Sequence, residues 1–330
     1  MRLVYYGTPE HAVPPLRRLA ADGLAPLLVV TRRDKPKGRG LALQPSPVRA
    51  AADSLGIPVV TPDHASAAEE VERVRALSPD LLVVVAYGQI LSPALLAVPR
   101  LGALNVHFSL LPRHRGAAPV QAALLAGDPE TGVGTMWMTE GLDEGPVFLE
   151  RATPIAPEEN AETLGERLAG IGAELLAESI DLIKRGVATR REQDHARATY
   201  APKLRTADAR LTFTDPADLL ARRVRAYTPE PGAWLDLESG RLVVLAASAA
   251  DEAGAPSDPS APRAIDSLPA PPGTVRAIDR ARGLGVACGQ GTLWLTRVRP
   301  AGRKEMSGAD YANGARLRAG SLLPPHGATA

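Results

Sequence analysis

The sequence predicts an α/β protein, with a doubly wound, mostly parallel sheet in the N-terminal part and a small β-barrel in the C-terminal part. Three observations support this. The 330 residues exceed the length of one average domain. In the first half, strand-like and helix-like runs alternate with a period of about 25 to 30 residues, as in a doubly wound sheet. In the second half, short strand-like runs follow one another between glycine turns, as in a small barrel.

The chain opens with a predicted strand at 2–6, which ends at a Gly-Thr-Pro turn at 7–9. A helix is expected next, because Pro14 and Pro15 are compatible with a helix start and Gly23 is suited to cap its end. A strand, a glycine turn and a helix in this order also occur in dinucleotide-binding proteins. Their fingerprint needs further glycines at fixed offsets, and these are absent here. NAD binding is therefore disfavoured.

The rest of the first domain, expected at 1–186, follows the alternating order. Strands are predicted at 27–31, 58–61, 81–86, 101–106, 133–138 and 147–155. Helices are predicted at 48–55, 65–77, 93–98, 118–126 and 161–184. The strand at 81–86 reads LLVVVA, and such an uninterrupted apolar run is expected of a strand buried on both faces of a parallel sheet.

A polar, irregular linker is expected at 187–204, followed by a second domain at 205–330. In the second domain we expect a helix at 216–226 and strands at 232–237, 241–246, 273–277, 285–288 and 292–298. Residues 249–272 are rich in Ala, Pro, Ser and Asp and contain almost no large apolar residue, which predicts a flexible insertion. The domain has 16 basic and 13 acidic residues. A small basic barrel is a common nucleic-acid platform, and also a common spacer.

The composition excludes several classes of protein. With 45% hydrophobic and 23% charged residues and no long apolar run, the chain is expected to be globular and without a membrane span. Its N-terminal residues do not have the pattern of a secretory signal. The single cysteine, Cys288, excludes an internal disulfide framework and a multi-thiolate zinc site. We therefore expect a cytoplasmic protein without a metal. The chain shows no coiled-coil pattern, and a monomer is expected.

The segment 31–49 is strongly basic, with six basic residues, among them Lys35, Lys37 and Arg39, and one acidic residue. Its two glycines and three prolines predict a long loop without regular helix or strand, and such loops are usually functional or disordered. Two interpretations remain open. The loop is either a solvated turn that happens to be basic or a segment that contacts nucleic-acid phosphates.

Residues 105–145 bring together side chains suited to catalysis. If the strand that begins at 101 stays extended to His107, then Asn105 and His107 point to the same side. They would lie at the carboxyl end of the strand, where open α/β sheets bind their ligands. Asp143, in a Gly-Leu-Asp-Glu-Gly run, could join them. Each residue alone also has an ordinary structural explanation in a turn, a loop or the core, so the prediction depends on their combination and spacing.

These motifs resemble those of folate-dependent formyltransferases. The motifs are Asn-x-His-x-Ser-Leu-Leu-Pro at 105–112, Arg-x-Arg-Gly-Ala-Ala-Pro at 113–119 and Gly-Leu-Asp-x-Gly at 141–145. The likeness extends to the Gly-Thr-Pro turn at 7–9, to Tyr-Ala-Pro-Lys-Leu at 200–204 and to the run at 299–306. It implies a Rossmann-like formyltransferase domain followed by an OB-like domain.

The resemblance implies transfer of a formyl group from 10-formyltetrahydrofolate to an amine, with Asn105, His107 and Asp143 as catalytic residues. In such a reaction the tetrahedral intermediate carries negative charge on the formyl oxygen, and the Asn105 amide is a suitable donor to it. His107 could donate or move protons, and Asp143 could hold the imidazole and accept a proton. The residues similar to those lining the family's folate pocket are Val85, Ala86, Tyr87, Gly88, Ser109, Leu110, Leu111 and Pro112.

The basic loop and the C-terminal run resemble the corresponding segments of those family members that formylate the amine of methionyl initiator tRNA. This implies tRNA contacts by Lys35, Lys37, Arg39, Lys203, Arg303 and Lys304. Two alternatives remain: formylation of a small amine, such as an amino sugar or glycinamide ribonucleotide, and an inert RNA-binding protein with a blocked folate site.

Three residues depart from the family's pattern, namely His11, Phe108 and Glu144. Phe108 could crowd the pocket or point into the core. We expect Glu144 to point to solvent, and His114 to lie at the surface near the substrate.

Overall fold

The computed structural model describes residues 1–37, 42–238, 240–250 and 270–323. The chain divides into two compact units. The first comprises Met1–Ala123, Asp128–Ile155 and Thr163–Lys203, and the second comprises Leu124–Gly127, Ala156–Glu162 and Leu204–Ala330. Within the described ranges, no helix is both long and apolar enough to cross a membrane.

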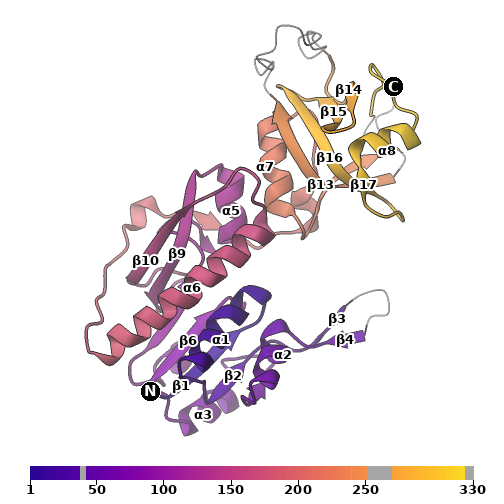
Figure 1. The fold of residues 1–330 in the computed structure, drawn as a ribbon. Helices are drawn as coiled ribbons and strands as arrows, with labels where there is room; N and C mark the ends of the chain where they lie inside the picture. Colours follow the sequence, from indigo (N-terminus) through magenta and orange to yellow (C-terminus); the bar gives the residue numbers. More distant parts are fainter. Residues whose placement is uncertain (38–41, 239, 251–269, 324–330) are drawn as a thin grey trace. The chain divides into compact units, whose positions relative to one another are not determined.

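The first unit is built on a seven-stranded sheet with the order β10-β9-β7-β6-β1-β2-β5 (Figure 1). The strands are β1 (Leu3–Gly7), β2 (Leu28–Val30), β5 (Val59–Val60), β6 (Leu81–Val85), β7 (Ala103–His107), β9 (Glu130–Trp137) and β10 (Val147–Pro154). The five strands from β7 to β5 are parallel, whereas β9 and β10 pair antiparallel. The predicted mostly parallel sheet is confirmed.

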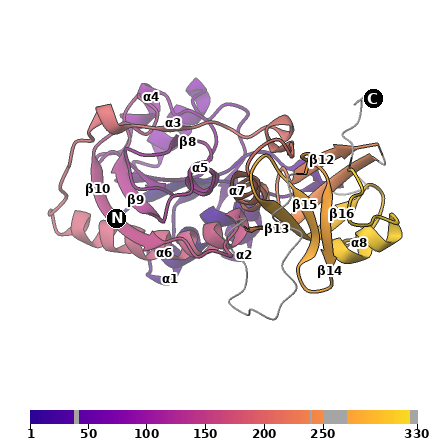
Figure 2. The same ribbon diagram turned by 90° about the horizontal axis from the view of Figure 1, so that it is seen from above.

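The helices of this unit lie on both faces of the sheet. They are α1 (Val13–Ala21), α2 (Pro47–Ser54), α3 (Ala68–Ala76), α4 (Pro93–Leu96), α5 (Pro119–Ala126) and α6 (Ala161–Lys184). Figure 2 shows α3 and α4 on one side of the sheet, and α1, α2 and α6 on the other. Every residue of β1, β6 and β7 is buried, as the apolar run of β6 predicted.

The basic segment contains a β-hairpin, so the expectation of a loop without regular strands was wrong there. Strand β3 (Lys35–Lys37) pairs antiparallel with β4 (Ala42–Gln44). These two strands form a sheet of their own. Proline is tolerated in β3 because a strand with only one neighbour leaves alternate N–H groups outside the ladder. Residues 38–41, which include Arg39, lie outside the described residues.

Residues 187–203, most of the expected linker, belong to the first unit. Strand β11 (Tyr200–Ala201) pairs in parallel with β8 (Arg115–Gly116). At Gly116 an added Cβ would lie 2.6 Å from the carbonyl oxygen of Ala201, and φ is +117°. Glycine therefore permits this close pairing. Arg191 forms an isolated bridge with Val147.

The second unit contains an antiparallel sheet with the order β12-β13-β16-β15-β14. The strands are β12 (Ala233–Leu237), β13 (Gly240–Ala250), β14 (Val275–Asp279), β15 (Gly283–Ala287) and β16 (Thr292–Pro300); β17 (Met306–Ser307) pairs with β16. Helices α7 (Ala217–Tyr227) and α8 (Gly308–Gly314) belong to the same unit. Leu220 and Val224 of α7 share one apolar core with sheet residues such as Val244 and Leu295.

The expected OB-like closure of this sheet stays a prediction, because no ladder joins β12 to β14 within the described residues. Strand β13 extends to Ala250, so residues 249–250 of the expected insertion belong to a strand. Residues 251–269 of the expected insertion lie outside the described residues, and residues 270–272 form no helix or strand.

Candidate active site

A cavity of about 620 Å³ lies at the carboxyl ends of β6 and β7 in the first unit. Asn105, His107 and Asp143 all border it. Its volume is within the range of small-molecule sites. The structure therefore brings the three predicted catalytic residues to one cavity.

The placement of Asn105 and His107 follows from the length of β7. The strand stays extended to His107, with Asn105 paired to Met136 and His107 to Gly134. Residues two apart on a strand share a face, so both side chains reach the cavity. They are nevertheless largely buried, with 8% and 5% of their surface exposed.

A hydrogen bond fixes which nitrogen of His107 carries a proton. Nε2 lies 3.0 Å from the carbonyl oxygen of His114. A carbonyl oxygen only accepts, so Nε2 must donate. In the neutral ring Nδ1 is then unprotonated, and it lies 3.7 Å from Oδ2 of Asp143. Nδ1 can therefore take up a proton, and the nearby carboxylate would stabilise the resulting imidazolium.

Asp143 is held both at its carboxylate and at its main chain. The backbone N–H of Gly116 donates to Oδ2 at 2.8 Å. The side-chain amide of Gln193 donates to the main-chain carbonyls of Asp143 and Gly145, at 2.8 and 2.7 Å. Asp143 itself has φ of +54°, a left-handed conformation that Asp tolerates better than most residues. Sequence reasoning missed Gln193, which lies in no motif and 50 residues from Asp143.

Arg115 is the most deeply placed charged residue of this region, with 1% of its surface exposed. Its guanidinium donates to Oε1 of Gln193 at 2.8 and 3.1 Å and to Nδ1 of His195 at 3.1 Å. It also lies 3.5 Å from the Glu144 carboxylate, whose side chain is 42% exposed. Glu144 thus reaches solvent, as expected, while pairing with a buried cation. The Arg-x-Arg-Gly motif marked Arg115, but the sequence did not show what it contacts.

His114 is buried, with 7% exposure, and the expectation of a surface position was wrong. Its Nε2 lies 2.7 Å from Oδ2 of Asp128, whose other oxygen accepts from Arg113 at 2.5 Å. His114 has φ of +58°, and its partner Asp128 lies 14 residues away in the sequence. Neither feature follows from a histidine between two arginines.

The residues expected to bind folate divide into two groups. Ala86, Tyr87 and Gly88 border the cavity. Val85 and the run 109–112 are not among the residues that line it. In that run the Ser109 hydroxyl donates to the Arg113 carbonyl at 2.6 Å, which closes a turn, and Leu111 packs in a small apolar cluster. The assignment of these residues to folate stays a prediction.

Phe108 borders the cavity without filling it. Its ring is 6% exposed and packs edge to face against His11, with ring centroids 6.0 Å apart. A Cβ added at Gly172 of α6 would lie 3.4 Å from Cε1 of Phe108. The ring is thus turned toward the sheet-facing side of α6, and the cavity of about 620 Å³ exists with Phe108 in place.

The residues expected to contact tRNA lie in several segments. Lys203, Arg303 and Lys304 are exposed, and Lys35 and Lys37 belong to β3. Arg39 lies outside the described residues. Their contact with tRNA stays a prediction.

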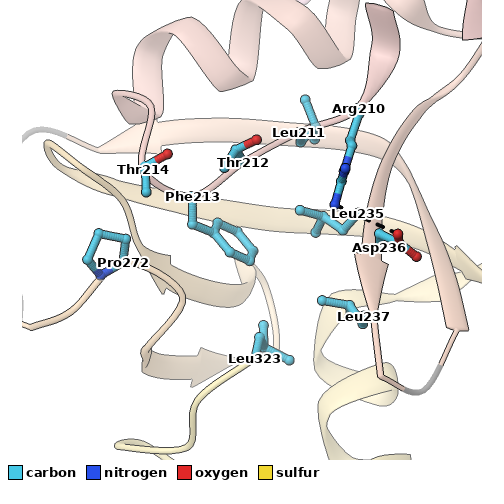
Figure 3. Close-up of a pocket in the computed structure, with 10 residues that line it drawn as sticks. All are labelled: Arg210, Leu211, Thr212, Phe213, Thr214, Leu235, Asp236, Leu237, Pro272 and Leu323. Carbon is cyan, nitrogen blue, oxygen red and sulfur yellow. Dashed lines mark ion pairs between the residues drawn. The ribbon is translucent and has the colours of Figure 1, made fainter. Parts of the chain in front are cut away.

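A second cavity, of about 110 Å³, lies within the second unit (Figure 3). Its walls are mainly apolar, with Leu211, Phe213, Leu235 and Leu237 among them, and an ion pair of 3.7 Å between Arg210 and Asp236 lies at one side. It is smaller than typical ligand sites, and several of its apolar side chains belong to the core.

Comparison with known proteins places these features in a family. The family model described as formyl transferase matches residues 1–180. The chain belongs to the formyl transferase family. The family's C-terminal domain matches residues 203–316.

A methionyl-tRNA formyltransferase of Halorhodospira halophila is 49% identical over 316 residues, covering 96% of this chain and 97% of the relative. Another, from Methylococcus capsulatus, is 44% identical over 314 residues, covering 95% and 96% of the two chains. Among solved structures, HypX from Aquifex aeolicus in complex with tetrahydrofolic acid is similar, with a TM-score of 0.62 and 16% identity over 94% of this chain and 47% of HypX. At that identity the likeness shows the fold of a formyl transferase alone.

Proposed function

We propose that this chain transfers the formyl group of 10-formyltetrahydrofolate to the free amino group of methionyl initiator tRNA, giving N-formylmethionyl-tRNA for translation initiation. The observation that carries the proposal is the 49% identity, along 96% of this chain, to a methionyl-tRNA formyltransferase. The cavity with Asn105, His107 and Asp143 supplies the chemistry that such a transfer needs.

The reaction begins when the neutral amine attacks the formyl carbon. A tetrahedral intermediate forms, and the former carbonyl oxygen becomes an oxyanion to which the Asn105 amide donates. The attacking nitrogen gives up its proton to Nδ1 of His107, and the imidazolium is stabilised by Asp143. The bond between the formyl carbon and N10 of the folate then breaks, and N10 leaves with the proton that Nδ1 of His107 took up, so that the imidazole returns to its neutral form. The chain's own residues supply one donor, one base and one carboxylate.

The formyl donor is placed in the cavity, where Ala86, Tyr87 and Gly88 border it. Ala86 and Gly88 have φ of +45° and +79°, so the backbone turns sharply on both sides of Tyr87. Phe108 limits the cavity and leaves room for a ligand of drug-like size.

The acceptor tRNA would contact basic residues of the segment 31–49, of the end of the first unit and of the second unit, namely Lys35, Lys37, Arg39, Lys203, Arg303 and Lys304. Their charges would contact phosphates. A small amine such as an amino sugar carries no extended phosphate backbone for these basic residues to contact. We propose that the protein performs this role in translation as a cytoplasmic monomer.

A mass-spectrometric assay tests the function. Purified protein, 10-formyltetrahydrofolate and charged methionyl initiator tRNA are mixed, and the methionine released from the tRNA is examined for the added formyl mass. A signal that is lost in His107→Ala supports both the reaction and the site. If no signal appears while tetrahydrofolate still binds by calorimetry, the acceptor is a different amine. If folate does not bind either, the inert RNA-binding alternative is favoured.

A further inference from the structure

We propose that Gln193 is a positioning residue, which holds Asp143 in the orientation needed for proton transfer by fixing the main chain on both sides of Glu144. The proposal rests on the proposed function, because it concerns the same site. Gln193 lies outside all the motifs that define the site, and it acts through Asp143 and not on the substrate.

The loop that carries Asp143 needs support from elsewhere. It joins β9 to β10 without regular structure between Met138 and Pro146, and Asp143 is left-handed in it. A non-glycine residue in this region of φ,ψ space is strained and persists only where its surroundings hold it. At Gly145 a side chain would collide with the carbonyl oxygen of Trp137, so the end of the loop lies tightly against β9.

Gln193 provides that support with both ends of its amide. Its Nε2 group has two hydrogens and donates one to the carbonyl of Asp143 and one to the carbonyl of Gly145. Its Oε1 accepts two hydrogen bonds from the guanidinium of Arg115. Carbonyls only accept and guanidinium only donates, so the orientation of the amide is fixed. All four contacts are made by a side chain that is 7% exposed.

The segment that delivers Gln193 is itself anchored to the same region. Arg191 and Val147 exchange two main-chain hydrogen bonds of 2.9 Å, and Val147 begins β10, directly after the loop. Further along, β11 pairs with Arg115 and Gly116. The segment therefore contacts both the loop of Asp143 and the residue whose N–H binds the Asp143 carboxylate.

Fixing the main chain of Asp143 also fixes the position of its carboxylate. With the Asp143 main chain fixed, Oδ2 accepts from Gly116 and lies 3.7 Å from Nδ1 of His107. Without the two donors from Gln193, the carbonyls of Asp143 and Gly145 lose their hydrogen-bond partners. An unsatisfied buried carbonyl is unfavourable, so the loop would turn these groups toward water. The carboxylate would then move away from His107.

Kinetics of three variants test this. Gln193→Ala removes all four contacts, whereas Gln193→Glu keeps an acceptor for Arg115 but places oxygens against two carbonyls. Displacement of a reacting group by about 1 Å can cost on the order of 100-fold in rate, so we expect kcat to fall by about 10- to 100-fold in both, with KM for the folate changing less than about threefold. Gln290→Ala, which removes the same atoms from an exposed residue of the second unit, should behave as wild type. Full activity in Gln193→Glu would overturn the proposal.

A double variant separates positioning from general stability. If Gln193 acts through Asp143, then Gln193→Ala should lower kcat by less than about threefold when Asp143 is already alanine, because coupled residues are not additive. The same fold loss in both backgrounds would show that Gln193 acts independently of Asp143, and the proposal would be wrong.

Amide exchange provides a readout that does not need activity. The N–H of Gly116 donates to the Asp143 carboxylate, so its exchange by NMR should speed up in Gln193→Ala and in Asp143→Ala to a similar degree. The neighbouring N–H of Ala117, which donates to the Ala201 carbonyl, should stay protected. Unchanged exchange at Gly116 in Gln193→Ala would refute the positioning role. Should the wild type show no formyl transfer, the proposed function fails and this measurement still decides on Gln193.

Discussion

The proposed catalytic cluster consists of Asn105, His107 and Asp143. Replacing Asn105 with alanine removes the one uncharged side-chain donor that this cluster offers to an oxyanion. Asn105 borders the cavity, and its amide makes no hydrogen bond to another residue of the described ranges. The other donor, Nε2 of His107, is already bound to the His114 carbonyl. His107 could therefore donate to the substrate only through Nδ1, and only when the ring is charged.

The expected loss of rate in Asn105→Ala follows from this arrangement. Loss of one oxyanion donor costs about 2.7–4 kcal/mol, which is roughly 100- to 1,000-fold in kcat. No second neutral side-chain donor of the cluster can replace Asn105, so we expect Asn105→Ala to show the full effect. Asn105→Asp has nearly the same shape but brings acceptors in place of donors, and its loss should be at least as large.

Single-turnover formylation with saturating folate donor measures the chemical step directly, and circular dichroism melting provides the control for folding. Because no protein hydrogen bond of Asn105 is broken within the described part of the chain, the melting temperature of Asn105→Ala should stay within a few degrees of wild type. Retention of more than about a tenth of the wild-type rate in the folded variant would refute the assignment of Asn105 as the main donor. A rise in KM with unchanged kcat would assign it to substrate binding instead.

Other predictions concern stability and tRNA. Burial raises the pKa of Tyr87 to about 12 from its ordinary value of 10.0, and its hydroxyl has no hydrogen-bond partner among the described residues. The free energy of unfolding that this pKa difference contributes is complete below pH 10 and is lost as the pH rises toward 12. Tyr87→Phe should therefore lose less stability than the wild type in this pH window. Urea denaturation at pH 8 and 11 checks this, and equal losses in the two proteins would contradict it. Asp128 pairs with buried His114, and Asp128→Asn should lower the free energy of unfolding by about 2 kcal/mol, whereas unchanged urea midpoints would show that the pair is neutral overall. Arg39→Ala should reduce the slope of log K against log salt for tRNA binding by about 1 and leave folate binding intact; loss of both would argue for a folding defect.

Much of the first unit could be predicted from the sequence, because its signals are local. The apolar run of β6 predicted a strand buried on both faces, and the extended residues up to His107 predicted that Asn105 and His107 share one side. The short hairpin of β3 and β4 was missed, because its proline and glycine content outweighed any strand signal. An antiparallel pairing of three residues in each strand leaves little trace in a sequence.

The contacts around the proposed catalytic residues could not be predicted, because they join distant parts of the chain. Gln193 reaches Asp143 across 50 residues, and His114 is held by Thr199 across 85. A polar segment such as 187–203 carries no periodic pattern that would mark it as part of the first unit. The barrel closure was predicted from short strands and glycine turns, which indicate antiparallel pairing but not which strands meet at the edges.

The pairing of β8 with β11 has a consequence for the order in which the enzyme becomes active during its synthesis. Domains fold as the chain leaves the ribosome, N-terminal part first. Asn105, His107 and Asp143 emerge well before Tyr200 and Ala201, so a nascent chain has its proposed catalytic side chains before it has the strand that lies beside Gly116. The first unit thus matures only after residues 187–203 have been translated. Comparison of fragments 1–186 and 1–203 would show this, with Gly116 amide protection expected only in the longer one.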